Sequence, residues 1–186
     1  MQTTSELVSE LENIERQKKA GRFYIYLRYK GSTSVVNLTF SNGALTGLVS
    51  KGTDLKGSLD LITHGAVLKI LFVPTAGDTE GAGKTPSIGI SELIDLVRNS
   101  KDRSSTDSGD ITITEHMAYL QEVATDIMIN LIGESGKDDI KKIARDISPY
   151  EKPREFLDAC RDMVAQVVGD GTAQTAFEEL YREQSK

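Results

Sequence analysis

The chain has 186 residues, 38% of them hydrophobic and 6% aromatic, enough for one ordinary domain or two small ones. Its net charge of −6 and pI near 5.0 argue against a general nucleic-acid binder and against a protein held on anionic lipid by charge. The single cysteine, Cys160, excludes an internal disulfide and a cysteine-rich zinc site, and a reduced compartment fits it best.

No apolar run approaches the ~20 residues that a membrane-spanning helix needs. The first residues are polar and helical in pattern, without the apolar core of a signal peptide. We therefore expect a soluble, cytoplasmic protein without membrane insertion.

The chain opens with a predicted helix and a predicted strand. Leu7, Leu11 and Ile14 repeat at helical spacing, which indicates an amphipathic helix packed on the sheet that follows. Residues 22–30 alternate with period two and are rich in β-formers, which predicts a half-buried strand.

Two further strands and a tight turn are expected next. Gly31 and Ser32 turn the chain into a strand at residues 35–40. Asn42 and Gly43 then predict a hairpin, because both residues tolerate the positive φ angle of a tight turn. The third strand follows at once.

A helix and a fourth strand complete this block. Leu55, Leu59 and Ile62 are helically spaced, and residues 68–73 form a continuous apolar strand. One sheet covered by helices on one face is the natural packing for this order of elements.

A domain boundary is expected near residue 100. A short helix is predicted at residues 91–98, and residues 99–112 open with NSKDRSSTDSGD, a run without apolar residues that is typical of a flexible linker. We place one domain at residues 1–98 and the other at residues 113–186.

The pattern of apolar residues predicts helices throughout residues 113–186. Apolar stripes lie at residues 120–132 and 156–168, and a last helix is marked by apolar residues from Ala173 onward. Glycines and prolines separate these segments, which favours a compact antiparallel bundle. The fold class expected is α+β: a small antiparallel β-meander with covering helices, linked to an all-α helical bundle.

Turn glycines and core apolar residues follow a family-like order between residues 21 and 74. They are Gly21, Leu38, Phe40, Asn42, Gly43, Ala44, Leu45, Leu48, Gly57, Leu59, Ile62 and the closing strand LKILFV. In this order the block resembles the PATAN family, the PatA-amino-terminal-like domain of bacterial response regulators and related signalling proteins. Ser58 stands where the family usually has alanine, and residues 64–66 replace its usual turn.

This resemblance implies a bacterial protein–protein interaction module in signalling, often tied to surface motility or pilus control, with no catalytic residues to carry over. We therefore expect a non-enzymatic signalling or scaffolding adaptor, without cofactor or metal, whose partner is a protein. A homodimer, with the amphipathic N-terminal helix as one candidate seam, is left open.

Basic and aromatic side chains interleave on the first predicted strand. Tyr24, Tyr26 and Arg28 are candidate partner-binding residues, together with Asn42 at the hairpin turn. Docking through this face or through an exposed sheet edge is the expected mechanism. Such a face can also stack bases, so a single-strand nucleic-acid binder is an alternative, which the acidic chain disfavours.

A second alternative is an NTP-binding regulator. The segment GAGKT begins at Gly81 and ends in Lys84 and Thr85, as a phosphate-binding loop does. The loop needs a glycine where Asp78 stands, and Pro86 follows where a helix should start, so a loop without phosphate is favoured.

The remaining reactive residues are predicted to be structural. Cys160 lies within an apolar stripe, where a thiol behaves as a small hydrophobe. His64 ends a helix and His116 starts one, and neither has a neighbour at metal-ligand spacing. The segment GESGK at residues 133–137 is interpreted as a turn between helices.

Overall fold

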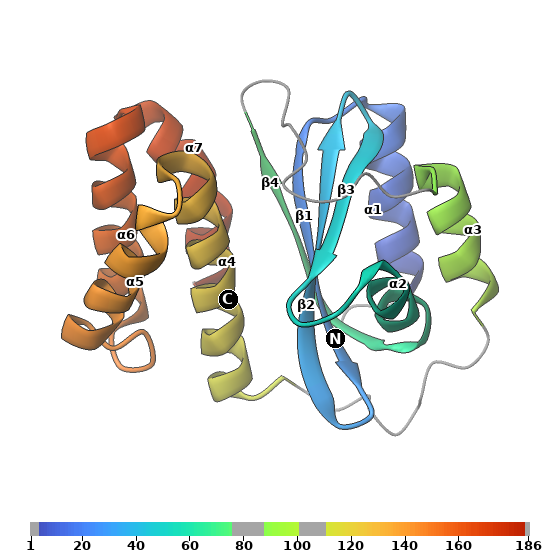
Figure 1. The fold of residues 1–186 in the computed structure, drawn as a ribbon, viewed down its shortest axis with the longest axis horizontal. Coiled ribbons are helices and arrows are strands. Elements are labelled where there is room, and N and C mark those ends of the chain that lie inside the picture. The colour runs from blue at the N-terminus through green and yellow to red at the C-terminus, as the bar shows by residue number, and fades with distance from the viewer. Residues whose placement is uncertain (1–3, 76–87, 101–110, 185–186) are drawn as a thin grey trace. The chain divides into compact units, whose positions relative to one another are not determined.

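Two compact units, Met1–Ile111 and Thr112–Lys186, make up the computed structural model. We call them the α/β unit and the helical unit; the structure describes residues 4–75, 88–100 and 111–184. Among these residues, one four-stranded antiparallel sheet accompanies seven helices, and the last four helices form the helical unit (Figure 1). The expected α+β fold class with a helical C-terminal region is confirmed.

The sheet consists of β1 (Gly21–Tyr29), β2 (Ser32–Ser41), β3 (Ala44–Ser50) and β4 (Ala66–Pro74). Its order is β3-β2-β1-β4, and every neighbouring pair is antiparallel. The first three strands form the expected meander, whereas β4 crosses over to pair with β1. Strands β3 and β4 are therefore the two edges (Figure 1).

Three helices lie on one side of the sheet: α1 (Thr4–Arg16), α2 (Leu55–His64) and α3 (Ile90–Asn99) (Figure 1). Their apolar faces and one face of the sheet share a core that includes Leu7, Leu11, Ile14, Phe23, Ile25, Leu27, Val36, Leu38, Phe40, Ile62, Leu93, Ile94 and Val97. The apolar residues of α1 are thus used inside its own unit, so the idea that this helix supplies a dimer seam is wrong.

The two hairpin turns have the same backbone signature. Asn42 and Gly43 have φ angles of 49° and 78°, as predicted for the turn between β2 and β3. The turn between β1 and β2 falls on Lys30 and Gly31, with φ angles of 52° and 76°, and not on Gly31 and Ser32 as expected. A type I′ hairpin turn needs positive φ at both central residues, and Lys30 supplies the first despite its side chain.

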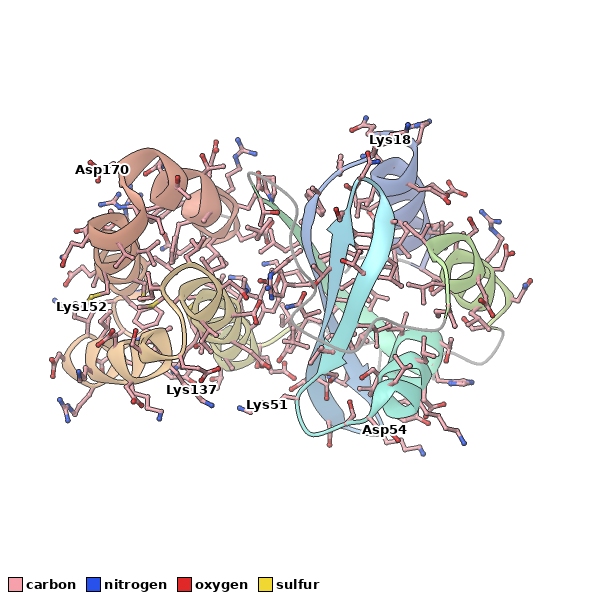
Figure 2. The ribbon with its side chains drawn as sticks, turned by 45° about the horizontal axis from the view of Figure 1, so that its top comes forward. Lys18, Lys51, Asp54, Lys137, Lys152 and Asp170 are labelled. Atoms are coloured by element: carbon pink, nitrogen blue, oxygen red, sulfur yellow. The ribbon has the colours of Figure 1, made fainter. Side chains whose placement is uncertain are left out.

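The helical unit contains α4 (Ile113–Ile132), α5 (Ser135–Asp146), α6 (Pro153–Val168) and α7 (Asp170–Gln184). Helix α4 packs against the other three, and α6 packs against α7. In Figure 2, Lys137, Lys152 and Asp170 mark the first turns or starts of α5, α6 and α7. The buried residues of these helices include Tyr119, Leu120, Val123, Ala124, Ile127, Met128, Ile140, Phe156, Leu157, Cys160, Val164, Ala173, Phe177 and Leu180.

One end of the predicted α6 stripe is not buried. Val167 is 64% exposed, and Met163 and Val168 are half-buried. The buried part of the stripe thus ends with Val164, one turn before the helix does. Within the described ranges, the helices are all too short or too polar to cross a membrane.

Candidate binding face of the sheet

Strand β1 directs two different sets of side chains to the two faces of the sheet. Phe23, Ile25 and Leu27 belong to the core beneath the helices. The alternate residues lie on the opposite face, because successive side chains of a strand point to opposite sides. They are Arg22, Tyr24, Tyr26 and Arg28, and we call the sheet surface centred on them the tyrosine face.

The neighbouring edge strand extends the tyrosine face. Tyr24 is paired with Leu71 of β4, and Tyr26 with Lys69. Residues directly opposite each other in an antiparallel pair share a face of the sheet. Lys69 is thus a further candidate binding residue that sequence reasoning missed, because nothing local in the sequence shows that β4 lies beside β1.

The tyrosine face carries cations and no carboxylates at its strand positions. Arg22, Arg28 and Lys69 are the charged residues of the four strands, which contain no Asp or Glu. All three lie on this face by register. Guanidinium and ammonium groups beside an apolar layer favour the approach of carboxylates.

The rings at the centre of this face are excluded from water. Tyr24 is 1% exposed and Tyr26 is 3% exposed, whereas Arg28 is half-buried. The prediction of a half-buried strand is therefore wrong for residues 21–27 of β1, which are buried whichever face of the sheet their side chains lie on. Buried rings offer no open face for stacked bases, which weakens the nucleic-acid alternative.

Asn42 does not belong to this face. In the register of β1 and β2, Gly21 pairs with Phe40 and Tyr29 pairs with Ser32. The Asn42 turn is therefore at one end of the sheet and Arg28 is near the other. The structure brings Tyr24, Tyr26 and Arg28 together and leaves Asn42 exposed in its turn.

The cysteine and the histidines take part in structural contacts. Burial raises the pKa of the Cys160 thiol to about 12, so it stays protonated and is a poor nucleophile. His64 lies at the end of α2, where its Nδ1 is 2.9 Å from Asp60 Oδ1. His116 is half-buried in the first turn of α4. Nowhere in the described part of the chain do three His, Cys, Asp or Glu residues gather as metal ligands would.

A shallow hollow of about 360 Å³ lies between the end of α2 and α3. His64, Glu92 and Asp95 contribute polar groups to it, and Leu96 contributes an apolar one. His64 is already paired with Asp60, and the side chains of Glu92 and Asp95 are exposed. These groups are therefore solvated and do not converge on a buried reaction centre.

The two segments that imitate phosphate loops have different outcomes. GAGKT at residues 81–85 lies outside the described residues. GESGK at residues 133–137 links α4 to α5 through Gly133 and Glu134 only, and its last three residues already belong to α5; an added Cβ at Gly136 would be 2.9 Å from the Met128 carbonyl. A helix, not a strand, precedes this segment, so it lacks the setting of a phosphate loop.

The chain matches no protein-family model, no curated protein and no solved structure. The resemblance of residues 21–74 to the PATAN family therefore stays a prediction. What the tyrosine face can bind has to be argued from its own chemistry.

Proposed function

We propose that this chain is a non-enzymatic adaptor that binds other proteins through the tyrosine face. The observation that supports it is the composition of that face, which has two half-buried cations, Arg28 and Lys69, beside the buried Arg22 and the tyrosines, and no carboxylate at strand positions. Tyrosine and arginine are enriched in protein interfaces, because each combines a large contact area with polar groups. A cytoplasmic setting in bacterial signalling, motility or pilus control rests on the PATAN resemblance.

The partner best matched to this face is a protein surface that presents carboxylates. Tyr24, Tyr26 and Leu71 are at most 5% exposed and form a buried layer beside the half-buried Arg28 and Lys69. The Arg28 guanidinium can donate two hydrogen bonds to one carboxylate. Because Tyr24 and Tyr26 are desolvated, an anion that reaches the adjacent cations is weakly screened by solvent. Specificity would come from charge.

Affinity purification of the tagged full chain from its native cells, read by quantitative mass spectrometry, tests this function. We expect reproducible capture of at least one protein. Arg28→Glu should lower its recovery by about tenfold or more, because it places a carboxylate against the carboxylates of the partner.

Lys56→Glu is the matched control, since it makes the same charge change at an exposed position of α2, away from the tyrosine face. It should leave capture unchanged, and circular dichroism should show both variants folded. Absence of any reproducible partner, or capture that ignores Arg28→Glu, would overturn the proposal.

A further inference from the structure

The turn between β2 and β3 contains the one asparagine of the chain that a glycine follows. Asn42 precedes Gly43, whereas every other asparagine precedes isoleucine, leucine or serine. The side-chain amide of an asparagine is attacked most readily by the backbone nitrogen of the next residue when that residue is glycine, because no Cβ obstructs the approach. Asn42 is exposed, so water reaches its side chain. Of all the asparagines, Asn42 is therefore the one most prone to deamidation.

The fold restrains the attacking nitrogen. Gly43 is buried, and its N–H donates to the Lys19 carbonyl at 2.9 Å. The φ angles of Asn42 and Gly43, 49° and 78°, are those of a tight hairpin turn. A backbone N–H in a buried hydrogen bond is protected from proton loss to solvent, and the attack needs that proton to leave. The reaction therefore requires that the turn first separate from the end of α1.

We propose that Asn42 is a deamidation site controlled by the contact of its turn with the end of α1, a property independent of the proposed adaptor function. The Gly43 nitrogen bonds to Asn42 Cγ, the Cγ–Nδ2 bond breaks, and the amide nitrogen leaves as ammonia with the proton that Gly43 lost. Water then opens the cyclic imide. Opening at Cγ gives aspartate, and opening at the Asn42 backbone carbonyl carbon gives isoaspartate, whose main chain runs through Cβ and Cγ.

The two products differ in how they fit the fold. Isoaspartate lengthens the main chain of the turn by one carbon atom. The backbone at Gly43 has no room for this change, because even a Cβ there would be 2.9 Å from the Glu15 carbonyl oxygen and 3.0 Å from Cα of Lys18, which lies in the turn after α1 (Figure 2). Aspartate keeps the length of the main chain and tolerates positive φ as asparagine does. Isoaspartate should therefore separate the turn from α1, and aspartate should not.

Peptide mapping of the full chain by mass spectrometry, after incubation in mildly alkaline buffer with and without unfolding urea, tests the proposal. In urea, replacement of the amide NH2 by OH should be faster at Asn42 than at any other asparagine. In the folded chain the rate at Asn42 should fall by about tenfold or more, because only the open fraction reacts. Hydrogen exchange of the Gly43 N–H should be slowed as well, since both reactions need the same opening.

A matched pair of substitutions locates the control. Ile14 at the end of α1 and Ile25 in the middle of β1 are both fully buried in the same core. Ile14→Val loosens the end of α1 and should accelerate deamidation of the folded chain by about twofold to tenfold, as the loss of one buried methylene allows. Ile25→Val removes the same group away from the turn and should have a smaller effect.

Asn42→Asp separates the effects of the two products. This variant should melt close to the native chain, whereas the isoaspartate form isolated after incubation should melt at a lower temperature. Four results would each overturn the proposal: no deamidation at Asn42 in urea, equal rates in the folded and unfolded chain, equal acceleration by the two valine substitutions, or equal melting of the aspartate and isoaspartate forms.

Discussion

At the residue scale, Gly31 and Gly43 differ in why glycine is needed: backbone conformation alone at Gly31, and both conformation and close packing at Gly43. Both have positive φ angles, 76° and 78°. A Cβ at Gly31 would meet nothing within 4 Å, whereas a Cβ at Gly43 would be 2.9 Å from the carbonyl oxygen of Glu15 and 3.0 Å from Lys18 Cα. The Gly43 N–H also donates to the Lys19 carbonyl at 2.9 Å, so the hairpin turn is held against the end of α1.

Gly43→Ala should therefore destabilise the protein more than Gly31→Ala. The Gly31 variant incurs only the cost of a left-handed alanine, about 1 kcal/mol. The Gly43 variant adds a backbone clash that moves α1 or the turn, about 1 kcal/mol or more beyond that. Urea unfolding of the two variants measures the difference, and equal midpoints would show that the contact with α1 does not constrain the turn.

The same turns show what a local pattern can predict. Asn42 and Gly43 were predictable, because this pair is the usual solution for two positive φ angles. Lys30 was not, because lysine rarely takes positive φ and does so here because the register of β1 and β2 requires it. The chemistry of Tyr24, Tyr26 and Arg28 on one face also followed from period two, but their burial did not, since burial depends on neighbours that are distant in the sequence.

At the element scale, the order of strands is the part that sequence could not supply. The meander β1, β2 and β3 follows from short turns between consecutive strands. The position of β4 depends on where α2 returns the chain, and it pairs with β1 rather than with the strand before it. Lys69 therefore joins the tyrosine face through a tertiary pairing that no local signal encodes.

The start of α4 is fixed by a capping box. The Glu115 N–H donates to Thr112 Oγ1 at 3.2 Å, and the Thr112 N–H donates to Glu115 Oε2 at 2.9 Å. These bonds satisfy two of the backbone donors that a helix N-terminus leaves unpaired. The signature T-x-x-E at residues 112–115 is local, so the sequence contains this boundary.

Thr112→Ala should destabilise the helical unit by about 1 kcal/mol, because the Glu115 N–H loses its acceptor. For a unit of this size that corresponds to a fall in melting temperature of about 4–8 °C. Thr114→Ala is the control, since Thr114 is exposed two residues later and does not cap the helix. Calorimetry of both variants tests the expectation. An equal fall in melting temperature for the two substitutions would show that the Thr112 cap does not stabilise the helical unit.

At the scale of the whole molecule, charge is divided between the two units. Residues 1–111 contain equal numbers of acidic and basic side chains, so the net charge of −6 belongs to residues 112–186. The cations of the tyrosine face are thus a local feature of a neutral unit within an acidic chain. A local cationic face favours an anionic partner, and the acidic remainder of the chain repels a long polyanion.

The full chain should therefore not bind single-stranded nucleic acid appreciably. Phosphate contacts would have to overcome the net negative charge, and Tyr24 and Tyr26, at 1% and 3% exposure, have no ring face on which a base can stack. Fluorescence polarisation with labelled single-stranded DNA and RNA at low salt is the measurement, and the titrations should be flat. Binding that weakens steeply with added salt, and that Arg28→Glu abolishes, would instead assign the tyrosine face to nucleic acid.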